Sequence, residues 1–127
     1  MDGMPFTPGR PVTEAKAELF KALAHPARVR VLELLAEREH TMGELAELSG
    51  LEPSHLSQHV MQLRRAGIVD SRRVKTTVIS SLRDPQMAEL LAVARQLIGN
   101  NLRHGQALLA ALDSADDAVS GAGRVSA

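Results

Sequence analysis

A chain of 127 residues is long enough for one domain of ordinary size and too short for two. It has no Cys, which excludes disulfides, thiolate metal sites and thiol redox sensing, and its two Phe without Trp or Tyr exclude single-strand binding through stacked aromatic rings. No apolar run approaches the ~20 residues of a membrane span, and the N-terminus lacks a signal-peptide pattern. We therefore expect a cytoplasmic protein with no membrane partner.

The formal net charge is zero, but the charges are unevenly distributed. Residues 53–83 carry six Arg or Lys side chains against Asp70 alone, a net charge of +5, whereas residues 25–52 have a net charge of −3. A basic segment inside a neutral chain is typical of a protein that turns one face toward phosphate. A solvated basic patch without a partner is the alternative.

The N-terminal residues 1–12 hold three Pro and show no periodicity, so we expect a flexible arm. Thr13 is the predicted cap of a first helix over residues 14–24. Pro26 then opens a second helix to about Glu37, with a broad apolar surface that favours a central position in the core.

Two short helices with a turn between them follow. Thr41 and Glu44 fit a capping box at the start of a third helix, and Gly50 suits its left-handed end. Pro53 opens a fourth helix over residues 53–66, which closes at Gly67. The spacing predicts a helix-turn-helix.

Residues 68–82 are rich in β-branched side chains and predict a two-stranded hairpin that turns at Lys75 and Thr76. Asp84 and Pro85 then cap a long last helix that we expect to end near Leu112, followed by a disordered tail over residues 113–127. The expected fold is mostly α with a small β-hairpin: about five helices in one domain, residues 13–112.

The fourth helix presents two different faces when it is drawn at 100° per residue. Leu56, Val60 and Leu63 point inward, whereas the opposite face carries amides, hydroxyls and a guanidinium and no acid. Gln can pair with adenine, and Arg with guanine or phosphate. The residues expected to contact DNA, from this helix and the hairpin, are Ser54, His55, Ser57, Gln58, His59, Gln62, Arg65, Arg72, Arg73, Lys75 and Thr76.

Three segments carry a family resemblance: residues 22–28 (ALAHPAR), 54–60 (SHLSQHV) and 63–69 (LRRAGIV). Together they resemble the ArsR/SmtB family of bacterial winged helix-turn-helix repressors, over roughly residues 15–112. The resemblance implies a homodimer, joined through its first and last helices, that represses transcription by occupying an operator in double-stranded DNA. The apolar stripe of the last helix independently favours a partner. The expected dimer residues are Leu19, Phe20, Leu23, Met87, Leu90, Leu91, Ala94, Ile98 and Leu102.

The metal sites for which that family is known are not matched. The chain has no thiolate, and its last helix offers Asp84, Glu89 and a single His104. His55 and His59 have a spacing that can hold Zn²⁺, but both fall where DNA contact is expected, and His40 is expected in a solvated loop. We therefore expect no metal or other cofactor. A metal-responsive repressor is the runner-up, beside regulation by an unknown small molecule or protein.

Two other classes of function compete with a DNA-binding regulator. An enzyme would need a nucleophile–base pair or a paired-carboxylate cleft, and neither pattern is present: Ser57 and His59 point to different sides of their helix. We therefore expect no catalytic residues. A helical protein-interaction module could turn the same basic face toward an acidic protein, and a DNA-binding assay separates that case from the first.

Overall fold

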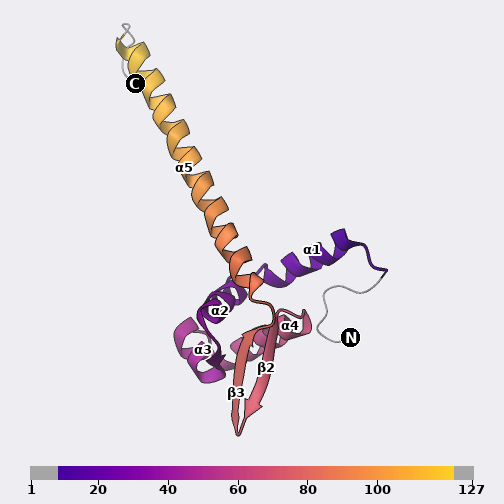
Figure 1. Ribbon diagram of the computed structural model, residues 1–127. Coiled ribbons are helices and arrows are strands. Elements are labelled where there is room, and N and C mark those ends of the chain that lie inside the picture. The colour runs from indigo at the N-terminus through magenta and orange to yellow at the C-terminus, as the bar shows by residue number, and fades with distance from the viewer. Residues whose placement is uncertain (1–8, 122–127) are drawn as a thin grey trace. The chain divides into compact units, whose positions relative to one another are not determined.

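The computed structural model describes residues 9–121 of the chain (Figure 1). They form two compact units, one up to Leu90 and one from Leu91 onward, which are described separately. The elements in chain order are α1 (Val12–Leu23), α2 (Pro26–Glu37), β1 (His40–Thr41), α3 (Met42–Ser49), α4 (Pro53–Arg65), β2 (Val69–Val74), β3 (Thr77–Leu82) and α5 (Gln86–Gly121).

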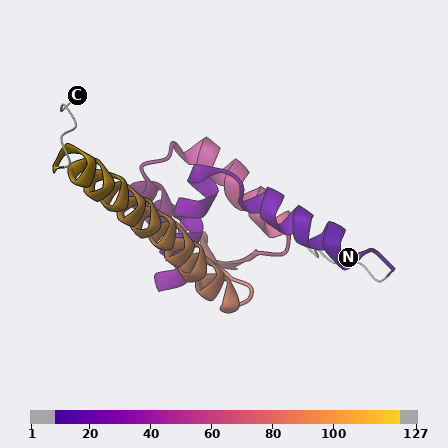
Figure 2. The same cartoon turned by 90° about the horizontal axis from the view of Figure 1, so that it is seen from above.

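The core of the first unit lies where α2, α3 and α4 meet the small sheet. α2 is central, as its broad apolar surface predicts, and α1 contacts α4 (Figures 1 and 2). Burial of apolar side chains is the main driving force for this packing. The largest fully buried apolar residues are Val31, Leu32, Leu45, Leu56, Leu63 and Val69.

The predicted helix-turn-helix is present, and its caps set the turn. The Thr41 hydroxyl accepts from the Glu44 N–H at 3.1 Å, and the Thr41 N–H donates to the Glu44 carboxylate at 3.0 Å. Gly50 ends α3 with φ of 73°, a left-handed conformation that glycine adopts without a steric cost. These caps fix where α3 begins and stops, and therefore where α4 can start.

The hairpin formed by β2 and β3 pairs from Val69 with Leu82 to Val74 with Thr77, and in Figure 1 it projects beyond the helices. Lys75 has φ of 58°, and Thr76 is not among the positive-φ residues. The loop is therefore two residues long, with the positive φ carried by Lys75 in place of the usual Asn-Gly pair.

A third strand was not predicted. β1 pairs with β3, which gives the sheet order β1-β3-β2. It contains His40, so the expectation of a solvated loop at this residue was wrong. His40 is 2% exposed, and its Nε2 lies 3.1 Å from the Leu34 carbonyl oxygen. Two residues are too short for an alternating pattern to reveal a strand.

At both ends of the domain, the observed helix bounds differ from the predicted ones. α1 begins at Val12 and its preceding residue Pro11 makes no side-chain cap, so Thr13 is not the cap. α5 continues to Gly121 instead of ending near Leu112. The predicted arm and tail otherwise fall on residues 1–8 and 122–127, outside the described residues. Within the described part, no helix is both long enough and apolar enough to cross a membrane.

Candidate nucleic-acid interface

α4 is built so that its polar face remains available. Pro53 occupies the first turn, where its missing N–H costs nothing, and the Glu52 side chain caps the helix by accepting from the His55 N–H at 3.3 Å. Glu52 also accepts from the Ser54 hydroxyl, and this hydrogen bond is the main reason that the pKa of Glu52 is lowered. The helix start is therefore held by its own residues.

The predicted division of α4 into two faces is present for most positions. Leu56, Val60 and Leu63 are buried against the core. The exposed face carries short hydroxyls, amides and cations, which are donors and acceptors suited to base edges and phosphate. Its members from the predicted set are Ser54, His55, Ser57, Gln58, Gln62 and Arg65.

His59 differs from the other predicted contact residues because it faces a neighbouring helix junction. It is only partly exposed, and its Nδ1 accepts a hydrogen bond from Arg28 Nε at 3.2 Å. The ring of His25 lies 4.4 Å away, centroid to centroid. Burial, followed by the nearby His25 and Arg28, lowers the pKa of His59. The neutral ring is therefore favoured, as its role as an acceptor requires.

Arg28 holds this junction together. Its Nη1 donates to the Ala22 carbonyl oxygen at 3.1 Å, so one guanidinium links the end of α1, the start of α2 and the middle of α4. Its partners His59 and Ala22 lie on the two neighbouring helices. His25 lies at the same junction, where its Nδ1 accepts from the Ala27 N–H at 3.2 Å.

The cations of the wing, the β2–β3 hairpin, fall into two groups. Arg72 forms two parallel hydrogen bonds with the Glu39 carboxylate, at 2.7 and 2.8 Å. This pairing lowers the pKa of Glu39 and raises the pKa of Arg72. Arg73 and Lys75 are exposed, and no carboxylate among the side chains that the structure describes pairs with them. Glu39 was missed because 33 residues separate it from Arg72, and no local pattern joins them.

The histidines of the described part do not assemble into a metal centre. His55 lies 3.9 Å from Glu52, whereas His59 is bonded to Arg28, so the two rings serve different neighbours. Among the described residues, no group of three His, Asp or Glu side chains lies close enough to hold an ion.

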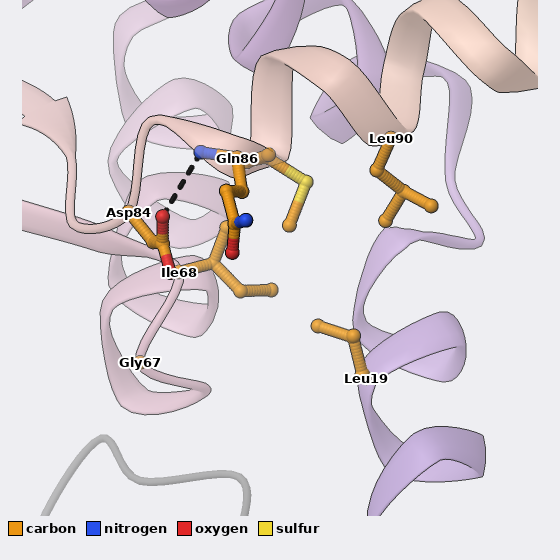
Figure 3. Close-up of a pocket in the computed structure, with 7 residues that line it drawn as sticks. Leu19, Gly67, Ile68, Asp84, Gln86 and Leu90 are labelled. Atoms are coloured by element: carbon orange, nitrogen blue, oxygen red, sulfur yellow. Dashed lines mark hydrogen bonds between the residues drawn. The ribbon is translucent and has the colours of Figure 1, made fainter.

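An apolar pocket of about 350 Å³ lies where α1, the α4–β2 junction and the start of α5 meet (Figure 3). Leu19, Ile68 and Leu90 point toward it, and Met87 completes the apolar lining. Asp84 caps α5 beside it by accepting from the Gln86 N–H at 2.9 Å, as predicted. Three of the expected dimer residues thus line one hollow of the first unit.

The other expected dimer residues also retain apolar surface within one chain. Phe20 is 54% exposed, Ile98 63% and Leu102 64%. Ala94 is exposed, whereas Leu23 and Leu91 are half-buried. Further along α5, Leu108, Leu109 and Leu112 are more than half exposed. A soluble monomer rarely leaves so many large apolar side chains uncovered on one element.

Several known proteins are similar to this chain in sequence and in structure. Residues 25–71 match the model of a family described as bacterial regulatory protein, arsR family. A protein of Mycobacterium tuberculosis named as an uncharacterized HTH-type transcriptional regulator, Rv0081, is 51% identical over 100 residues, 78% of this chain and 88% of the relative. Its crystal structure matches with a TM-score of 0.69, at 50% identity, over 76% of this chain and 97% of that one.

Two further solved structures are similar. One, from Mycobacterium bovis, is described as a homodimeric winged helix-turn-helix DNA-binding domain of a possible ArsR-family regulator. It is 26% identical to this chain, with a TM-score of 0.65, and the match covers 77% of this chain and 95% of the other chain. The other, BigR of Xylella fastidiosa, is titled a transcriptional repressor; it is 32% identical, with a TM-score of 0.64 and coverages of 67% and 87%. The chain belongs to the arsR family of bacterial regulatory proteins, with their winged helix-turn-helix fold.

Proposed function

We propose that the chain is a homodimeric transcriptional repressor that acts in the cytoplasm and binds an inverted-repeat operator in double-stranded DNA. The observation that carries this proposal is the exposed face of α4, which has amide, hydroxyl and guanidinium groups but no carboxylate from Pro53 to Arg65. A face of this kind is complementary to base edges in a major groove.

The interface divides into reading and positioning groups. Gln58 and Gln62 have amides that can form paired hydrogen bonds with adenine, so we assign base contacts to them. Arg73, Lys75 and Thr76 lie at or beside the turn between β2 and β3 and are assigned to phosphate. His59 is assigned to support of α4 instead of base contact, because its ring already accepts from Arg28.

The dimer is supported by uncovered apolar surface and by the homodimeric relative from Mycobacterium bovis. Two-fold proteins select two-fold DNA, and each protomer would supply one α4 to one half-site. We place the dimer contact on α1 and α5, using the residues predicted above, because both helices retain exposed apolar side chains after the first unit has closed its core.

The inducing signal is proposed to be something other than a transition metal. The chain has no thiolate, and no group of three His, Asp or Glu side chains among the described residues lies close enough to hold an ion. A single imidazole binds metal weakly, so tight sensing needs more ligands than these positions bring together. A metal-responsive repressor that uses His104 or the His55 and His59 pair remains the alternative, and metal-induced operator release would support it.

The test is an electrophoretic mobility shift against genomic fragments at two salt concentrations. We expect a subset of fragments to stay bound at the higher salt, because base contacts add to the phosphate term that salt weakens. Equal loss of all fragments would contradict specific recognition. The matched control is Arg73→Ala, which should weaken the binding of every fragment by a similar factor and leave their rank order unchanged.

A further inference from the structure

A second, basic hollow lies beside α4 and shares Gln62 and Arg65 with the proposed DNA face. It has a volume of about 520 Å³ and is formed by the end of α1, the start of α2 and the end of α4. We call it the basic cleft and define it by Arg10, Lys21, His25, Arg28, Gln62 and Arg65. All of these residues belong to the first unit.

The cations of the basic cleft are of two kinds. Arg10 pairs with Glu14 and Glu18, and Arg28 donates to His59 and to the Ala22 carbonyl oxygen, whereas Lys21 and Arg65 have no such partner among the described side chains. Lys21 and Arg65 are both exposed side chains. His25 accepts the Ala27 N–H on Nδ1, so its neutral ring carries the proton on Nε2, which makes Nε2 a donor. The carboxylate of the cleft, Glu18, is already paired with Arg10 at 3.5 Å. The result is a hollow rich in cations and N–H groups.

Helix-end electrostatics explains only part of this arrangement. Lys21 and Arg65 each lie in the last turn of a helix, where a cation offsets the negative end of the helix dipole. That effect accounts for one cation at each helix end. It does not account for a shared hollow that also includes His25, Arg28 and Gln62 and whose volume is typical of a small-molecule site.

We propose that the basic cleft binds a phosphoryl group, and that a small phosphorylated metabolite supplies it. Guanidinium, ammonium and imidazole N–H groups are the donors that bind phosphate most strongly. The volume exceeds that of one bare phosphate, which leaves room for further atoms of a ligand. A DNA backbone phosphate has the same chemistry and is the other source that an experiment must separate.

A ligand in the basic cleft would contact side chains of α4, the helix that carries the proposed DNA face. Gln62 and Arg65 belong both to the cleft and to the proposed DNA face, so one anion would compete with DNA for them. Arg28 joins the cleft to His59 in the middle of α4. This regulatory consequence rests on the proposed function, whereas binding of the anion itself does not.

The experiment is an NMR titration of the full chain with inorganic pyrophosphate, at constant ionic strength set by KCl and without DNA. We expect saturable shifts of amides in residues 21–28 and 62–66. Lys21→Ala with Arg65→Ala should weaken the apparent Kd at least about tenfold, since each charged hydrogen bond that is removed is worth about that factor. The matched control, Arg73→Ala with Lys75→Ala, removes the same charge from the wing and should change the Kd less than about twofold.

A second arm identifies the source of the phosphoryl group. If pyrophosphate does not saturate but Lys21→Ala alone, which keeps Arg65 of the DNA face, makes the salt dependence of DNA binding shallower by roughly one unit, the phosphoryl group is that of DNA. Weak shifts that never saturate, together with an unchanged salt dependence, would overturn the proposal. The pyrophosphate arm contains no DNA, so its outcome is independent of whether the chain is a repressor.

Discussion

His59 is the residue whose structural role departs most from its sequence signal. A histidine within a recognition helix suggests a base contact, yet its ring packs on His25 and accepts from Arg28. Nothing local in the sequence could show this, because the contact joins α4 to the α1–α2 junction through a side chain 31 positions away.

That contact has a measurable consequence. The lowered pKa of His59, caused first by burial and then by the nearby His25, Arg28 and His55 side chains, means that the unfolded chain binds the proton more tightly. The stability that this contributes is therefore complete above the ordinary pKa of about 6.5 and is lost as the pH falls through the lower folded value. An NMR titration should place His59 below 6.5, and Arg28→Met should raise its pKa. A wild-type value at or above 6.5 would contradict the contact.

Glu44 gives a second pH-dependent effect, at lower pH. Its hydrogen bond with the Thr41 N–H, assisted by Arg38, lowers its pKa to about 2. A carboxyl group with a lowered folded pKa stabilises the protein above its ordinary value of 4.5, and this contribution is lost between 4.5 and about 2. Glu44→Gln should lower Tm at pH 7 and converge with wild type near pH 2. Glu47→Gln, on the same helix, is the control, and a Tm difference that persisted at pH 2 would contradict the cap.

At the scale of elements, the sequence predicts what rests on local patterns. The capping box at Thr41, the left-handed Gly50 and the apolar face of α4 each follow from a few neighbouring residues, and each is present. The strand β1 and the exact start of α1 do not follow from neighbouring residues in this way. A two-residue strand exists only because β3 supplies its hydrogen bonds, and the sequence alone does not say which partner a strand will have.

The wing offers a prediction that no local pattern suggests. Glu39 holds Arg72 in a two-bond pair and thereby competes with phosphate for the same guanidinium. Glu39→Gln should strengthen binding to all DNA sequences severalfold and make the salt dependence steeper, by roughly one unit for each further phosphate that Arg72 binds. Isothermal titration calorimetry of DNA binding at several salt concentrations measures this slope. An unchanged slope would mean that Arg72 does not bind DNA; Glu33→Gln, on α2, is the charge-matched control.

At the scale of the whole molecule, the uncovered apolar side chains of α5 call for a second copy of the chain. Exposed apolar area of this kind is stabilised by burial against a partner. Light scattering should give about twice 13.7 kDa at micromolar concentration. Replacement of Leu91 and Ile98 together by Glu should yield monomers with weaker operator binding, since two half-sites are no longer held at once. A monomeric wild-type chain would refute the proposed dimer.

The central claim is that α4 reads bases in two symmetric half-sites, and in-vitro selection of bound DNA by wild type and by Gln58→Ala tests it most directly. Wild type should enrich an imperfect inverted repeat with half-sites about one helical turn apart. Gln58→Ala should lose its preference at the same position in both half-sites, at a cost of about 1–3 kcal/mol each. An enriched motif identical in the two proteins, or no motif in wild type, would contradict the claim.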